Sequence, residues 1–495
     1  MKRSVCIALL LSTTMLAEPA FAQDEPPVSA DDIRALRSEV QQLRAEVAEL
    51  KAKQQTPAPA QPVAVAPSWK GAPQFEDKDK GFSFKPKGTI QIDAGYVAIP
   101  GNAGGTVGPV TGAFGAAGVN SNNLGFNTRL RRAIIGVEGT LPGGFGYNAE
   151  FELSQGTVNY EDIVLTYQKK GSPLQLKLGY QFPLSSLELM TSSRVLSFTE
   201  RAGNTDAFGY SRRLGLSGTF ARKDVLLSAG LFSEDVANSN FNRTGWQASI
   251  RTLWMPKKGA LQLHLGANFQ HRIAPRDAQN VRYRMRPFTQ NTDQRFLDTG
   301  RIAADGDDIL GVEVAGTYNA FHFAAEGQKL WVRGYQNPLR AFGPNNGTGG
   351  AAAFLAADPS FVSGYAEVGV FLTGETRGYK GGRWDRTKVL KPFDKGGWGA
   401  FQINARVDYT NLQDQVAAGV LTPGSLNYAN GGKQTGYGLS LVWLPTDFLR
   451  FTTQYTHVAL TGGPAALAPF TAVVQPFNER DYNTDAILVR AQVDF

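Results

Sequence analysis

The feature that most constrains this chain is an alternation of apolar and polar residues, repeating with a period of two from about residue 82 to residue 495. Such residues point to opposite faces of an extended strand, which then has one apolar and one polar face. Residues 261–270, 401–409 and 487–495 show the pattern clearly. The polar faces carry charge over about ten residues, the length of a tilted membrane-spanning strand. A soluble sandwich also alternates, but these long charged strands favour a membrane-spanning sheet.

Transmembrane helices cannot account for a membrane crossing by this chain. Beyond residue 22 no apolar run approaches the roughly 20 residues that a transmembrane helix needs. A sheet that spans a bilayer has to close on itself, because only closure pairs every backbone amide and carbonyl inside the protein. The sequence therefore predicts a closed barrel.

Counting the alternating segments gives sixteen strands. An even number lets the first and last strands of an antiparallel sheet pair. We predict an all-β fold, a sixteen-stranded antiparallel transmembrane β-barrel over residues 82–495, preceded by a short coiled-coil helix. The strands are expected at residues 88–99, 128–141, 145–154, 159–168, 174–181, 212–221, 225–232, 245–255, 260–270, 308–320, 321–332, 361–373, 396–410, 435–444, 448–459 and 485–495.

Tight and long connections alternate along the chain. Residues 141–144 (LPGG) and 444–447 (LPTD) are tight turns of one rim, and long Gly/Asn-rich loops belong to the other rim, which should face outside. Residues 374–396 break this pattern, because more than twenty residues lie on the tight rim. Their seven Arg and Lys residues predict a basic fringe at the periplasmic mouth.

The chain begins with the pattern of a secretory signal peptide over residues 1–22. Lys2 and Arg3 form the charged start, residues 5–16 the apolar stretch, and residues 20–22 (AFA) the cleavage site. Export from the cytoplasm is therefore expected.

Residues 23–55 have the heptad pattern of a coiled coil, with an amphipathic surface helix as the alternative. Residues 56–81 begin with a Pro/Ala-rich run, TPAPAQPVAVAP, which predicts a semi-rigid linker to the barrel. The apolar residues of the heptads are Ile33, Leu36, Val40, Leu43, Val47 and Leu50.

Composition and motifs argue against other classes of protein. A formal net charge of +7 on 495 residues is modest for a nucleic-acid partner. The single cysteine, Cys6, lies in the signal segment, so we expect neither a disulfide nor a lipid anchor in the mature chain. The four histidines are scattered, and the sequence contains no metal-site spacing, phosphate-binding glycine loop or nucleophile elbow. We therefore expect no catalytic residues, metal or cofactor.

Arginines mark the candidate site. Arg282, Arg284 and Arg286 alternate with apolar residues in a long loop, so their guanidiniums share one side and could line the outer vestibule. Arg131 and Arg132 are neighbours in a predicted strand. A regular strand would send one of them into lipid, at a cost of about 2–4 kcal/mol at the midplane. We therefore expect a β-bulge there, or a position close to a rim.

The third external loop, residues 182–211, is the natural segment to fold inward and narrow the pore. Arg194 and Arg201 share this loop with Glu188, Glu200 and Asp206. Its mixed charges do not by themselves predict strong anion selectivity.

Taken together, these residues resemble the phosphate-selective porin O/P family over most of the barrel. The segments that carry the resemblance are RLRRAIIGVEG (129–139), FGYNAEFEL (145–153), LTYQ (165–168), LGYQFPLSSLELMTSSRVLSFTER (178–201), SRRLGLSG (211–218), GETRGY (374–379), GWGAFQINARVDY (397–409) and TDAILVRAQVDF (484–495).

The resemblance implies a Gram-negative outer-membrane porin, a homotrimer of passive water-filled channels for small solutes, with a preference for anions such as phosphate. By motif, Arg131, Arg132, Arg194 and Arg201 would form the constriction, and the arginines at 282, 284 and 286 a ladder. Forked guanidinium donors suit tetrahedral oxyanions. The expected partners are small anionic solutes, outer-membrane lipid and peptidoglycan, the last reached by a periplasmic N-terminal segment. The alternative function is a structural barrel that tethers the envelope through this coil.

Overall fold

The computed structural model describes residues 29–55, 68–69, 71–100, 124–233, 244–276, 280–334, 357–414, 429–467 and 477–495. The chain divides into two compact units, Met1–Ala64 and Val65–Phe495. The predicted signal peptide, residues 1–22, lies outside the described residues, as do residues 56–67 of the predicted linker.

The first unit contains helix α1, Ala30–Gln55. Ser29 caps it: the Asp32 amide donates to the Ser29 hydroxyl over 3.2 Å, and the Ser29 amide donates to the Asp32 carboxylate over 3.1 Å. The six apolar heptad residues are 44–59 % exposed, so α1 presents an uncovered apolar stripe. No helix in the described part of the chain combines the length and apolar character that a membrane crossing needs.

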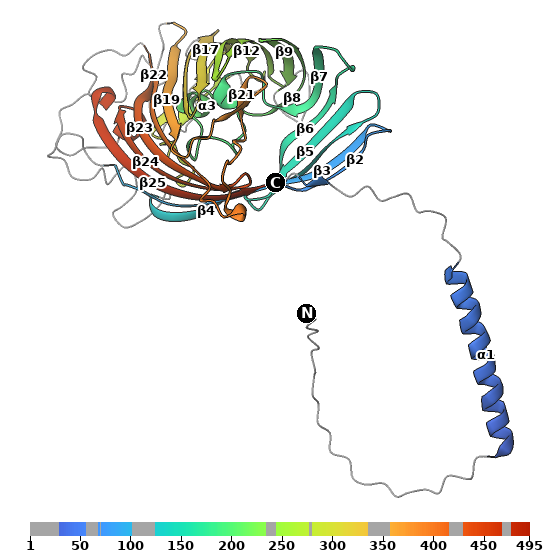
Figure 1. The fold of residues 1–495 in the computed structure, drawn as a ribbon. Helices are drawn as coiled ribbons and strands as arrows, with labels where there is room; N and C mark the ends of the chain where they lie inside the picture. Colours follow the sequence, from blue (N-terminus) through green and yellow to red (C-terminus); the bar gives the residue numbers. More distant parts are fainter. Residues whose placement is uncertain are drawn as a thin grey trace, which may run out of the picture. The chain divides into compact units, whose positions relative to one another are not determined.

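The second unit is the predicted closed barrel of sixteen antiparallel strands (Figure 1). The last strand pairs with the first, from Asp494 opposite Thr89 to Ala486 opposite Val97. The barrel strands are β3 Phe82–Val97, β4 Gly125–Leu141, β5 Phe145–Glu152, β6 Asn159–Tyr167, β7 Leu174–Gln181, β8 Arg213–Arg222, β9 Val225–Ser233, β10 Trp246–Trp254, β12 Leu261–Ile273, β17 Gly306–Tyr318, β18 Phe321–Arg333, β19 Ser360–Phe371, β22 Ala400–Asp414, β23 Ala429–Thr446, β24 Leu449–Thr461 and β25 Asp481–Asp494.

Every predicted strand has an observed counterpart, and the largest differences are six residues, at the starts of β3 and β23. The end of the predicted linker, residues 56–81, needs correction. Short strands β1 (Ser68–Trp69) and β2 (Pro73–Asp77) pair with each other, and β2 pairs with the early start of β3. This region extends the sheet. Phe75 of β2 lies opposite Phe84 of β3, and their ring centroids are 6.5 Å apart.

The barrel is apolar outside and polar inside. On β25, Ile487 and Val489 are 53 % and 46 % exposed on the outer face, whereas the alternating Arg490 and Gln492 are each 3 % exposed. A band of exposed large apolar side chains around a polar interior is the arrangement that lipid requires of a barrel.

The two rims differ, as predicted. At the short-turn rim, six connections are tight, at residues 142–144, 168–173, 223–224, 255–260, 319–320 and 447–448. At the opposite long-loop rim, two connections turn inward among the parts that the structure describes. We name residues 182–212 the constriction loop and residues 274–305 the arginine loop. The constriction loop carries short helices α2 (Leu187–Met190) and α3 (Gly203–Ala207).

The exceptional segment 372–399 of the short-turn rim is an inserted hairpin, built on β20 (Gly378–Lys380) and β21 (Arg383–Asp385), which lies inside the ring of strands (Figure 1). The Trp384 side chain is buried, and its backbone amide donates to Thr191 Oγ1 of the constriction loop over 3.3 Å. The predicted basic fringe is therefore only partly right. Five of the seven basic residues are exposed, but Arg377 and Arg386 turn inward to pair with carboxylates of the barrel wall.

Candidate functional site

The constriction loop is fastened to the barrel wall by its backbone. The Glu188 amide donates to Glu326 of β18 over 2.6 Å, and the Gly203 amide donates to Asp408 of β22 over 2.8 Å. The Thr199 amide donates to Gln454 of β24 over 2.9 Å. Bonds to three separate strands hold the loop as a fixed partition in the lumen.

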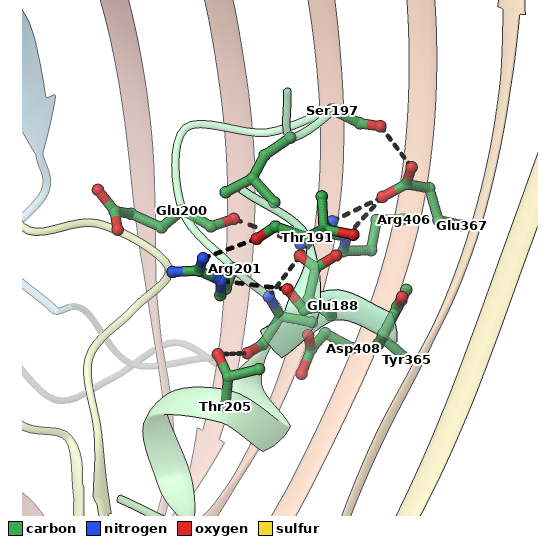
Figure 2. Close-up of polar contacts among 12 residues, drawn as sticks. Glu188, Thr191, Ser197, Glu200, Arg201, Thr205, Tyr365, Glu367, Arg406 and Asp408 are labelled. Carbon is green, nitrogen blue, oxygen red and sulfur yellow. Dashed lines mark hydrogen bonds and ion pairs between the residues drawn. The ribbon is translucent and has the colours of Figure 1, made fainter. Parts of the chain in front are cut away.

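The loop also closes on itself through an arginine (Figure 2). Arg201 donates to the carbonyl oxygens of Glu188 and Thr191, over 3.1 and 2.7 Å. The Glu188 carboxylate instead pairs with Arg406 of the wall, at 3.1 Å. Arg201 thus keeps a positive charge that no carboxylate neutralises within hydrogen-bond distance among the described residues.

Water reaches the inner faces of β5 to β7. Inward-facing residues of β18, such as His322 and Gln328, are buried beneath the constriction loop and the inserted hairpin. The inward-facing Gln91 of β3 is buried as well. By contrast, Asn148 of β5 and Gln175 and Lys177 of β7 are half-buried or exposed.

The predicted bulge lies on β4, where this strand pairs with β3. Gln91 of β3 pairs with Arg132, whereas the next residue, Ile92, pairs with Leu130, so Arg131 has no partner in the ladder. The extra residue turns both arginines inward and keeps them out of lipid. The Arg131 guanidinium donates to Glu200 over 2.6 and 2.9 Å, and Arg132 donates to the side-chain oxygen of Gln91 over 2.6 Å.

A cavity of about 190 Å³ joins the bulge, the constriction loop and the arginine loop; we name it the arginine cavity. Four guanidiniums and two carboxylates line it, from Arg131, Arg132, Arg201, Arg286, Glu200 and Asp206. Among the described residues, Arg132 and Arg201 form no ion pair with a carboxylate. The lining therefore carries two net positive charges, and two guanidiniums are free of counter-ions.

Two other groups of the cavity have fixed charge states. Burial raises the pKa of Tyr210 to about 12, so its hydroxyl remains neutral and donates to Gln328 over 3.1 Å. Burial alone would favour the protonated form of Glu200, but the Arg131 guanidinium outweighs it and holds the pKa of this carboxyl well below its usual range. Glu200 therefore stays charged and offsets Arg131.

The arginine loop has the predicted alternation. Tyr283 and Met285 are each 1 % exposed, and the arginines between and beside them face the other way. Arg282 donates to Asp298 over 2.8 Å, and Arg286 to the carbonyl of Thr292 over 3.0 Å. Arg284 is exposed. Only Arg286 of the three lines the arginine cavity.

Arg194 is separate from the other predicted site residues. It donates to Glu150 and to Thr89, each over 2.5 Å, and borders a second, much smaller cavity of about 20 Å³ nearer the short-turn rim. Sequence reasoning missed the other arginines of this cavity, Arg377, Arg386 and Arg450. Arg450 could have been found, because it occupies an inward-facing position of the predicted strand 448–459.

A closed barrel with an apolar exterior, a charged lumen and an inward-folded loop defines a porin-type channel of the outer membrane. The family model for phosphate-selective porin O and P matches residues 108–495, and the chain belongs to this family. The resemblance inferred from the motifs is thus confirmed. As a member, the protein is a channel and not an enzyme.

The chain is also similar to two relatives and to one solved structure. The chain is 34 % identical to an uncharacterized protein of Caulobacter vibrioides, over 99 % of this chain and 94 % of the relative. It is 25 % identical to porin O of Pseudomonas aeruginosa, over 78 % and 85 % of the two chains. An anion-selective porin from Comamonas acidovorans is 10 % identical with a TM-score of 0.45, covering 84 % of this chain and 100 % of that structure.

Proposed function

We propose that the protein forms a passive, water-filled channel that prefers small anions, phosphate among them. The observation that carries this proposal is the arginine cavity, which Arg132 and Arg201 line without a carboxylate partner among the described residues. An anion that enters exchanges water for forked guanidinium donors, which match the spacing of oxygens on a phosphate or carboxylate. A cation meets two net positive charges at the same place.

The arginine loop would supply the approach to this cavity. Arg284 is exposed, and Arg286 lines the cavity at the inner end of the alternating run. Successive positive charges raise the local concentration of anions and lower the barrier to entry. This function requires the long-loop rim to face the outside and the N-terminal segment to lie in the periplasm.

We also propose a homotrimer whose N-terminal helices associate. The apolar stripe of α1 is uncovered in the single chain, and the exposed apolar area would be buried by pairing with other copies. An envelope tether through α1 and contact with peptidoglycan remain the alternative role of this segment. The arginine cavity favours the channel, because a tether has no need of unpaired charges in its lumen.

The experiment is a reversal-potential measurement on the purified protein in planar bilayers under a potassium chloride gradient. We expect a chloride-to-potassium permeability ratio above one. Changing Arg282, Arg284 and Arg286 together to Gln should lower the ratio, because three positive charges leave the entrance. Phosphate should block the chloride current of the unaltered protein.

The matched control removes three positive charges elsewhere, by changing Lys169, Lys170 and Lys258 to Gln. These lysines are exposed at the short-turn rim, opposite the rim that carries the arginine loop. The control should change the ratio much less. A ratio at or below one in the unaltered protein, or equal effects of both triple variants, would contradict the proposal.

A further inference from the structure

The arginine cavity is lined by aromatic rings as well as by guanidiniums. Phe182, Tyr210 and Phe288 border it, and each is partly exposed. The ring of Phe182 lies under two guanidiniums, with the central carbon of Arg212 at 4.1 Å and that of Arg201 at 5.5 Å from its centroid. Charge and flat apolar surface thus meet in one cavity.

The position of Phe288 is costly to maintain. Its φ angle is +55°, in the left-handed region, where a residue with a Cβ is disfavoured. Strand β23 leaves room for the ring: a Cβ added at Gly436 would stand 2.1 Å from Phe288 Cε2. Residues held in a strained backbone conformation cluster at functional sites.

We infer that the arginine cavity binds organic anions that carry a flat apolar group beside a phosphate or carboxylate. The acidic group takes the free donors of Arg132 and Arg201, and the flat group stacks on Phe182 or Phe288 and on guanidinium planes. This inference rests on the proposed channel function and names the class of solute that the same site selects.

The test compares two probes with the same charged group, methyl phosphate and phenyl phosphate, as blockers of chloride current in planar bilayers. Stacking on a ring should make phenyl phosphate block at a concentration about fivefold lower. Phe288→Leu and Phe182→Leu each replace an aromatic ring of the cavity by an aliphatic side chain. Each variant should bring the blocking concentrations of the two esters closer together. Phe220→Leu is the matched control, because Phe220 is 39 % exposed on the outer face of β8.

The possible outcomes separate this inference from the proposed function. If methyl phosphate blocks as well as phenyl phosphate, the cavity recognises charge alone; the inference is wrong and the anion channel stands. A fivefold difference that survives both cavity variants would also overturn it. If neither ester blocks and the channel shows no anion preference, the proposed function fails as well.

Discussion

Neutralising Glu200 should make the channel more selective for anions. Glu200 is the carboxylate that offsets Arg131 in the arginine cavity, and it also accepts a hydrogen bond from Arg490 at 2.9 Å. Glu200→Gln keeps the shape of the side chain and removes one negative charge. The net charge of the cavity lining then rises from two to three.

The size of the effect follows from Coulomb's law. Two unit charges about 6 Å apart in a water-like medium interact by about 0.7 kcal/mol. Such an energy changes the local concentration of an anion about threefold. The same charge change lowers the local concentration of a cation about threefold. The chloride-to-potassium permeability ratio, measured from reversal potentials in planar bilayers, should therefore rise about tenfold.

The control has to separate charge in the passage from loss of a buried ion pair. Glu313→Gln removes a carboxylate that pairs with Arg251 at 2.8 and 2.9 Å, but Glu313 borders none of the described cavities. Both variants should lower the melting temperature, because each leaves a buried arginine without a carboxylate. Only Glu200→Gln should change selectivity. An unchanged or lower ratio in folded Glu200→Gln protein would refute the electrostatic role of the cavity.

Three further changes have distinct expected outcomes. Gly436→Val should displace the Phe288 ring, since even a Cβ would stand 2.1 Å from it, and should change single-channel conductance; an unaltered conductance would show that Phe288 does not border the path. Trp384→Ala removes a buried ring that lies under Arg377, so it should lower the free energy of unfolding by about 3–5 kcal/mol and with it the melting temperature. It should also raise single-channel conductance, because the inserted hairpin is held less firmly. Deleting residues 23–67 should make oligomers less heat-stable on unboiled gels but leave anion preference intact; loss of preference would assign the N-terminal segment to the pore.

The barrel could be predicted from the sequence because its signals are local. Period-two alternation marks each strand wherever one face meets lipid and the other meets water. The bulge could also be predicted from the sequence, because adjacent Arg131 and Arg132 cannot both follow a regular strand without exposing one to lipid. These inferences need no knowledge of distant contacts.

The details of the site depend on distant contacts and could not be read in the same way. The inserted hairpin enters the barrel because Trp384 and Arg377 find partners more than 150 residues earlier, in the constriction loop. Arg194 and Arg201 lie seven residues apart in one loop, yet they border different cavities. Charge type was visible in the sequence, whereas the partner of each charge was not.

The most direct test asks whether anions reach the arginine cavity through water. The single cysteine, Cys6, lies in the predicted signal peptide, so a cysteine introduced at Gln290, which lines the cavity, is expected to be the single reporter of the mature chain. Gln290→Cys should react faster with an anionic methanethiosulfonate than with a cationic one, relative to the same pair of rates at Thr157→Cys in an exposed external loop. Equal relative rates, or no reaction from either side of the bilayer, would contradict a water-filled passage that concentrates anions at these arginines.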